Sequence, residues 1–148
     1  MNSLRVYNVV VVEAGLKPAG LALLRENDLP VSDLDETKTL FAILSDGDVI
    51  GTGGLESFRD SALLRSISIK KDLQQTGLGK FIVGELEKTA RQSGVNCLYL
   101  LTTTAAGFFV KLGYETIDRE IVPIEIKNTT EFSSICPSTA EVMRKFLS

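Results

Sequence analysis

Glycines and a lysine follow a strand-like run at a spacing that could bind an anion. Residues 74–80 join the apolar run 62–69 to a helical pattern over 78–92, and they are Gln74, Gln75, Thr76, Gly77, Leu78, Gly79 and Lys80. The first N–H groups of a helix have no intrahelical partners and the helix dipole is positive there, so phosphate is stabilised at that end. Gly77 and Gly79 allow close approach to the main chain, and Lys80 adds a cation. The stretch predicts an anion-binding loop; an ordinary turn before a helix stays open.

Two well-known phosphate loops do not fit this stretch. A P-loop needs glycine where Gln74 stands and a hydroxyl residue where Phe81 stands. A dinucleotide-binding fingerprint that starts at Gly77 needs a third glycine where Ile82 stands. Both interpretations are therefore rejected.

Length, composition and charge limit the classes of protein. A chain of 148 residues with 44% hydrophobic and 24% charged residues is typical of one globular domain, 1–148. The net charge of -3 argues against a nucleic-acid partner, which usually requires a basic face. No run approaches the ~20 apolar residues of a membrane span. We expect a cytoplasmic protein without a nucleic-acid or membrane partner.

The cysteine and histidine content restricts the chemistry. The chain has two cysteines, Cys97 and Cys136, and no histidine. Cys97 lies in an apolar run, which predicts a small buried hydrophobe. Two isolated cysteines without histidine do not suit a structural zinc site, so no metal is expected. Without histidine, Ser-His-Asp and Cys-His catalysis is excluded, and any acid or base must be another group.

Strands and helices that would position the loop follow from periodicity and turn signals. Alternating or apolar runs predict strands over 5–12, 39–44, 49–55, 62–69, 95–101 and 114–118, and helical spacing predicts helices over 19–26 and 78–92. Asp46-Gly47 predicts a hairpin turn. The glycines at 51, 53 and 54 predict a bulge or the close approach of another group. The two strands that flank helix 78–92 should be parallel.

The second half of the chain is less regular. Hydroxyls at 102–104 predict caps for a short helix that continues to Leu112 and closes at Gly113. Thr129 or Thr130 is expected to cap one turn containing Phe132. The pattern Ser138-x-x-Glu141 predicts a helix from Thr139, whereas the family resemblance described next implies a strand over 142–146.

Three local patterns together resemble the GNAT superfamily of N-acetyltransferases. They are Ile67-Ser68-Ile69 before Gln74-x-x-Gly77-x-Gly79, the run 98–101, and Phe108-Phe109-x-Lys111-Leu112-Gly113-Tyr114. Residues 102–105, Pro123, Phe132 and the segment 136–143 are similar to N-acetylglutamate-synthase-like proteins and, more closely, to acetyltransferase-like proteins associated with arsenic resistance. The family usually has Arg and Gly where this chain has Gln74 and Gln75.

The resemblance implies an α/β (α+β) fold, a mixed and largely antiparallel sheet of about six to seven strands flanked by helices. It also implies acetyl-CoA as cosubstrate, lying in a wedge where the strands from Ala62 and Val95 splay apart. The backbone of Ile67, Ser68 and Ile69 would pair with the pantetheine, and residues 74–80 would bind the pyrophosphate. Thr103, Phe108 and Lys111 would line the remaining wall of the cofactor site. Their alternative roles are, respectively, a helix cap, a core aromatic and a solvated cation.

The implied reaction is direct attack of an amine on the thioester, which requires removal of a proton and stabilisation of an oxyanion. Glu56 is the first candidate base; it could instead be a solvated carboxylate or bind a cationic part of the substrate. Phe109 stands where many relatives have a tyrosine that protonates the leaving thiolate. Tyr114 and Cys136 are candidate substitutes, with core packing as the alternative. Arg65 could clamp a substrate carboxylate or form a structural ion pair.

Two functions follow from the resemblance. The first is an acetyl-CoA-dependent N-acetyltransferase acting on a small, amino-acid-like amine, with a role in arsenical detoxification among the options. Acidic amino acids, amino-acid-like arsenicals, polyamines and protein amines are all open as acceptors, and Cys136 would lie near the acceptor. The second is an acetyl-CoA-binding sensor or partner protein with little transferase activity. Assembly into a homodimer is left open.

Overall fold

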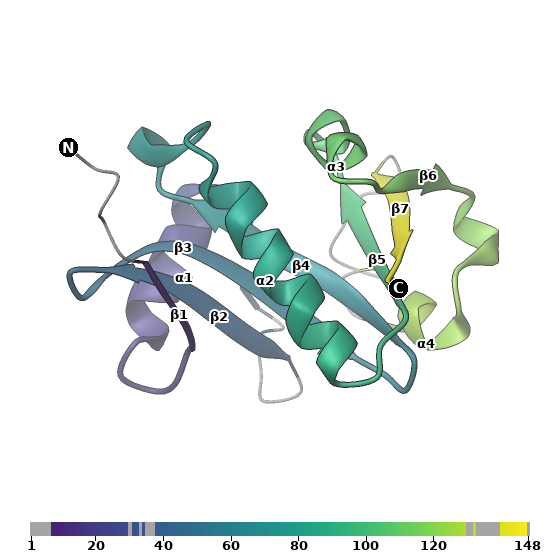
Figure 1. The fold of residues 1–148 in the computed structure, drawn as a ribbon, viewed down its shortest axis with the longest axis horizontal. Helices are drawn as coiled ribbons and strands as arrows, with labels where there is room; N and C mark the ends of the chain where they lie inside the picture. The colour runs from purple at the N-terminus through teal and green to yellow at the C-terminus, as the bar shows by residue number, and fades with distance from the viewer. Residues whose placement is uncertain are drawn as a thin grey trace. The chain divides into compact units, whose positions relative to one another are not determined.

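The computed structural model describes residues 7–29, 31–32, 34, 38–129, 132 and 140–147, and Figure 1 shows its elements. The strands are β1 (Asn8–Val11), β2 (Thr39–Ser45), β3 (Asp48–Ser57), β4 (Ser61–Ile69), β5 (Cys97–Thr102), β6 (Glu115–Ile117) and β7 (Glu141–Phe146). The α-helices are α1 (Lys17–Glu26), α2 (Leu78–Gln92), α3 (Ala106–Lys111) and α4 (Ile124–Lys127). Two 3₁₀ turns, η1 (Lys71–Leu73) and η2 (Arg119–Ile121), complete the described elements. No described helix is long and apolar enough to cross a membrane.

The strands form one mixed seven-stranded sheet in the order β1-β2-β3-β4-β5-β7-β6. β1 pairs antiparallel with β2, and β7 pairs antiparallel with both β5 and β6. β4 and β5 are parallel, with Ser61 opposite Cys97 and Leu63 opposite Tyr99. The crossover through α2 therefore has the predicted βαβ form, and the predicted mixed sheet with flanking helices is confirmed.

Contacts group the chain into two compact units. Unit 1 comprises Met1–Gly54 and Ser66–Leu86, and unit 2 comprises Leu55–Arg65 and Glu87–Ser148. The chain passes between the units within β3, β4 and α2. Each unit has its own buried apolar residues.

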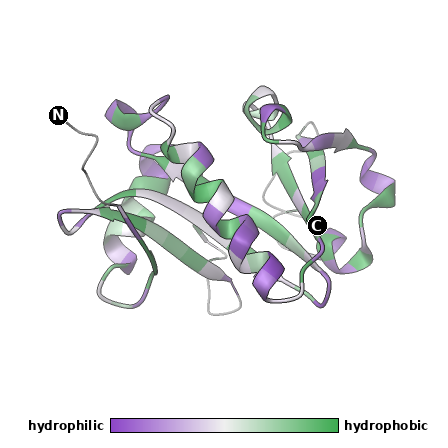
Figure 2. Cartoon of the chain, in the orientation of Figure 1, coloured by the Kyte–Doolittle hydropathy of each residue, from purple (hydrophilic) through white to green (hydrophobic). Residues whose placement is uncertain are grey.

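Unit 1 packs the first turns of α2 closely against glycines of β3. Ile82 and Leu86 are 0% and 1% exposed. A Cβ added at Gly53 would lie 2.4 Å from Leu86 Cδ1 and 3.0 Å from Ile82 Cγ1. The predicted close approach to this strand is confirmed, and the approaching groups belong to the protein's own core. In Figure 2 the glycine-rich β3 is paler than the hydrophobic β2 beside it.

Two turns of unit 1 have the predicted backbone geometry. Asp46 and Gly47, between β2 and β3, have φ of 52° and 84°, which a tight hairpin turn with two left-handed residues requires. Pro18 lies in the first turn of α1, and Asn27 caps the C-terminal end of that helix.

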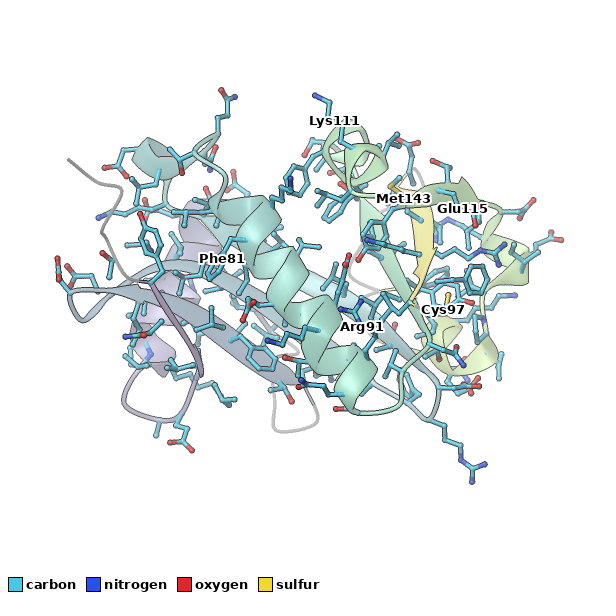
Figure 3. All side chains as sticks on the ribbon, viewed as in Figure 1. Phe81, Arg91, Cys97, Lys111, Glu115 and Met143 are labelled. Carbon is cyan, nitrogen blue, oxygen red and sulfur yellow. The ribbon has the colours of Figure 1, made fainter. Side chains whose placement is uncertain are left out.

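Unit 2 has a core of buried side chains from several strands and from the segment around α4: Leu63, Cys97, Tyr99, Val122, Ile126 and Val142. Cys97 is a free cysteine and is 4% exposed, so its predicted role as a buried hydrophobe is confirmed. Burial raises the pKa of its thiol. Figure 3 shows its side chain on β5, inside this unit.

The structure decides between the two alternatives for the tail and corrects one local prediction in unit 2. Residues 141–146 form β7 and not a helix, because pairing on both sides with β5 and β6 outweighs one capping-box pattern. The family-implied strand is thereby confirmed. The threonines do not cap α3 directly: its N-cap is Ala105, and Thr102 Oγ1 accepts a hydrogen bond from the Ala105 N–H at 2.9 Å. Thr129 does cap a turn, since its Oγ1 accepts from the Phe132 N–H at 3.2 Å.

Candidate functional site

The predicted anion loop lies in unit 1, between η1 and α2. Residues 74–77 are exposed, and α2 begins at Leu78 as predicted. The Phe81 N–H donates to Gly77 O at 3.0 Å, so the amides of residues 78–80 precede the first hydrogen bond of the helix. These amides and the helix dipole give the loop the anion-binding character inferred from sequence.

The loop contains two left-handed residues. Gly77 has φ of +93°, with no heavy atom within 4 Å of a hypothetical Cβ, and Gln75 has φ of 65°. A left-handed conformation costs a non-glycine residue about 1–2 kcal/mol. Gln75 thus adopts a left-handed conformation that glycine would adopt at lower cost. The family usually has glycine at this position. The Thr76 hydroxyl donates to Leu73 O and ties the loop to η1.

The Gln74 side chain points back to the protein. Its Nε2 donates to Ile69 O at 3.0 Å and to Asn27 Oδ1 at 3.4 Å. Asn27 Nδ2 in turn donates to Ile69 O at 3.0 Å and to Ser68 Oγ. Sequence reasoning missed Asn27. An asparagine at the end of a helix was visible, but its partners lie more than 40 positions away along the chain.

The end of β4 carries the other residues expected to face the pantetheine. Ser68 is 4% exposed, its hydroxyl donates to Leu23 O at 3.4 Å, and Ile67 is half-buried. Ser66, just before them, has φ of 58°, and its carbonyl accepts from Thr52 Oγ1 at 2.8 Å. A left-handed residue inside a strand is typical of one class of β-bulge, and bulges are frequent beside functional sites. The sequence carries no glycine there to signal it.

Glu56 and Arg65, the candidate base and clamp, lie together in unit 2. Arg65 Nη1 is 3.5 Å from Glu56 Oε1; the arginine side chain is 0% exposed and the glutamate side chain 12%. A fully buried guanidinium requires a counter-charge, because an isolated buried charge is costly. This geometry favours the structural ion pair over the substrate clamp for Arg65, and it holds Glu56 with its Oε1 buried and a small part of its side chain accessible.

Tyr114, the candidate acid, is buried and engaged. It is 3% exposed, and its hydroxyl donates to Glu87 Oε2 at 2.9 Å. Burial, followed by the Glu87 charge, raises the pKa of the Tyr114 phenol well above its ordinary value. Its ring packs edge-on against Phe109, with centroids 5.5 Å apart. These contacts favour the core-packing role that the sequence left open.

The remaining candidates are also in unit 2. Thr103 is exposed, Phe108 is 37% exposed, and Lys111 is exposed near the end of α3. Figure 3 shows Lys111 extending outward from that helix. Cys136 lies outside the described residues. Exposure of Thr103, Phe108 and Lys111 is compatible with contact to a cofactor.

Comparison with known proteins decides the family. A family model described as the acetyltransferase (GNAT) family matches residues 9–114. The chain belongs to the GNAT acetyltransferase family. It is 30% identical over 130 residues to the uncharacterized protein YyaT of Bacillus subtilis, covering 82% of this chain and 88% of YyaT.

Two longer proteins are also similar. The amino-acid acetyltransferase of Aeromonas salmonicida is 24% identical over 113 residues, which cover 74% of this chain and 25% of that protein. The structure of N-acetylglutamate synthase from Neisseria gonorrhoeae, complexed with coenzyme A and N-acetyl-glutamate, has a TM-score of 0.82 at 18% identity and covers 97% of this chain. This chain spans only 35% of that synthase chain.

Family membership gives the chain its cosubstrate class. This GNAT protein is an acetyl-CoA-dependent N-acetyltransferase. The amides at the start of α2 and the cation of Lys80 fit a pyrophosphate in charge and hydrogen-bonding character.

Proposed function

We propose that this acetyltransferase transfers the acetyl group directly to the amine of a small, amino-acid-like molecule. The observation that carries the proposal is the Glu56 carboxylate, held 3.5 Å from a buried guanidinium and still partly accessible. A fixed carboxylate attracts an ammonium group and can accept its proton. Similarity to the Aeromonas amino-acid acetyltransferase supports an amino-acid-like acceptor.

The chain's residues divide into two groups of roles. Residues 74–80 bind the pyrophosphate through the amides at the start of α2, and the backbone of residues 67–69 pairs with the pantetheine. The Ile69 carbonyl already accepts from Asn27 and Gln74. In unit 2, Thr103, Phe108 and Lys111 contact other parts of the cofactor.

Bound acetyl-CoA supplies a thioester whose carbonyl carbon the amine attacks, with the thiol as leaving group. Glu56 removes one proton from the substrate ammonium, which gives the amine its nucleophilic lone pair. The net change is one new C–N bond, one broken C–S bond and one proton released to solvent beyond the proton on the thiol. Phe109 is a phenyl ring and cannot protonate the thiolate. Since thiols ordinarily have pKa values of about 8.5, water can serve as the donor.

Arg65 acts on the acceptor through Glu56. Because its side chain is fully buried, it positions the carboxylate and does not itself clamp a substrate. Within this proposal, amino-acid-like arsenicals are one specific class of acceptor. The resemblance of residues 102–105 and Cys136-Pro137-Ser138 to arsenic-resistance-associated proteins supports that class.

The test is release of free coenzyme A thiol from acetyl-CoA with a panel of amines: glutamate, other amino acids, an amino-acid-like arsenical and a polyamine. We expect release that depends on an amino-acid-like amine. In Glu56→Gln, kcat should fall about 10²-fold or more and the pH dependence of the remaining rate should change. Glu125→Gln, an exposed carboxylate of α4, is the control and should be neutral.

Two outcomes would contradict the proposal. Turnover of Glu56→Gln equal to the wild type at every pH would remove Glu56 as base. Thermal stabilisation by acetyl-CoA without amine-dependent release would favour the sensor role instead.

A further inference from the structure

The end of α1 meets a distant segment of unit 1, the end of β4 and the loop that follows it, at one carbonyl. The oxygen of Ile69, at the end of β4, accepts from Asn27 Nδ2 and from Gln74 Nε2, both at 3.0 Å. Gln74 Nε2 also lies 3.4 Å from Asn27 Oδ1, and Asn27 Nδ2 donates to Ser68 Oγ. The end of α1, the end of β4 and the first residue of the loop are thus joined by two amide side chains.

Asn27 is itself firmly placed. Its backbone N–H donates to Leu23 O and Leu24 O, both at 3.2 Å, as the C-cap of α1. Leu23 and Leu24 are 4% and 0% exposed, so the helix end is anchored in the core of unit 1. The Asn27 side chain therefore provides a fixed amide to which the loop attaches.

The loop needs such an attachment. It has positive φ at Gln75 and Gly77, and the first of these is a non-glycine residue. An exposed loop of this kind has alternatives of lower strain, and ordering it when a ligand binds reduces affinity. At position 74 this chain has a neutral amide that is bonded to Ile69 and Asn27 and so holds the loop's first residue in place.

We propose that Asn27 is a positioning residue for acetyl-CoA binding: through Gln74 and Ile69 it holds the loop of residues 74–80 in the conformation that receives the pyrophosphate. This inference rests on the proposed use of that loop. Asn27 contacts no reacting atom in this account; its effect falls on the affinity for the donor and leaves the chemical step alone.

The experiment measures steady-state kinetics of Asn27→Ala and Asn27→Asp with acetyl-CoA and, as a second donor, with S-acetylpantetheine, which lacks the pyrophosphate. The aspartate keeps the size and the acceptor but loses the Nδ2 donor. Loss of one or two neutral hydrogen bonds predicts a KM for acetyl-CoA raised about 5–30-fold, with kcat within about twofold. The KM for S-acetylpantetheine should rise much less, because this donor lacks the pyrophosphate that the loop would bind. Asn128→Ala, at the C-cap of α4, is the matched control and should leave both donors unaffected.

A double-mutant cycle with Gln74→Ala isolates the contact. If Asn27 acts through Gln74, the KM of the double variant for acetyl-CoA should be no higher than the KM of the more affected single variant. The two changes should then not be additive. A variant with a lower melting temperature but an unchanged KM for acetyl-CoA, or with equal effects on both donors, would overturn the inference and leave Asn27 as a helix cap only.

One further variant separates this inference from the proposed function. Gly77→Ala places a side chain at φ of +93° and should raise the KM for acetyl-CoA if the loop binds the pyrophosphate. If Gly77→Ala weakens acetyl-CoA binding and Asn27→Ala does not, only the positioning role fails. If neither weakens it, the assignment of the loop itself fails.

Discussion

Substitution of Gly53 by alanine should test how closely α2 packs on β3. The added Cβ would lie 2.4 Å from Leu86 Cδ1, 3.0 Å from Ile82 Cγ1 and 3.1 Å from Ile67 Cδ1. The Leu86 and Ile67 atoms are terminal methyls of side chains that can rotate, but Ile82 and Leu86 are at most 1% exposed and have little space to move. Overpacking of a filled core typically costs about 1–3 kcal/mol.

The net effect includes a smaller opposing contribution. Glycine to alanine reduces the entropy of the unfolded chain and stabilises by about 0.4–1 kcal/mol where the conformation is compatible. We therefore expect Gly53→Ala to lower the free energy of unfolding by about 1–2 kcal/mol. With a urea m-value of about 2 kcal/mol/M, the midpoint should fall by about 0.5–1 M. Because α2 begins at the loop, the KM for acetyl-CoA should rise as well.

Gly84→Ala is the matched control on the same helix. Nothing lies within 4 Å of its hypothetical Cβ, so this variant should be more stable than the wild type by about 0.5–1 kcal/mol. Urea unfolding followed by circular dichroism measures both variants. If Gly53→Ala were as stable as Gly84→Ala, the packing argument for the glycines of β3 would be refuted.

Three further predictions concern the loop and the core of unit 2. Gln75→Gly should remove the backbone strain of a left-handed glutamine and raise the free energy of unfolding by about 0.5–1 kcal/mol, with no rise in the KM for acetyl-CoA. A loss of stability would contradict the strain argument. Burial raises the pKa of Tyr99 to about 12, so the folded state holds this proton more tightly than the unfolded chain, and stability that is present below pH 10 is lost as pH rises to about 12. Tyr99→Phe should reduce that alkaline loss in pH-dependent unfolding, and an identical pH profile would exclude Tyr99 as its source. Lys145→Met removes two hydrogen bonds of about 3 Å to the mostly buried Glu87 and should cost about 1–3 kcal/mol. Adding Glu87→Leu together with Tyr114→Phe, which removes the hydroxyl that donates to Glu87, should recover much of that cost, and thermal unfolding of the single and combined variants would reveal any failure to do so.

The sequence placed the central elements well where local rules agree with tertiary structure. Helix α2 has the predicted bounds because its apolar i, i+4 stripe and the glycine after it act over one or two turns. The Asp46-Gly47 turn followed from the φ values that these residues tolerate. For the tail, one capping pattern favoured a helix and the family resemblance a strand; local rules could not decide between them, because the strand Glu141–Phe146 depends on partners in β5 and β6.

The same division holds for the site. Residue types alone determined that this chain lacks histidine-based catalysis, and the spacing of Gly77 and Gly79 before a helix indicated an anion loop. Only the tertiary structure decided that Arg65 is buried against Glu56 and that Tyr114 donates to Glu87. It also decided that Asn27 reaches the loop through Gln74. The physical reason is range: helix starts and turns are set by neighbours in sequence, whereas burial and side-chain partners depend on segments that folding alone brings together.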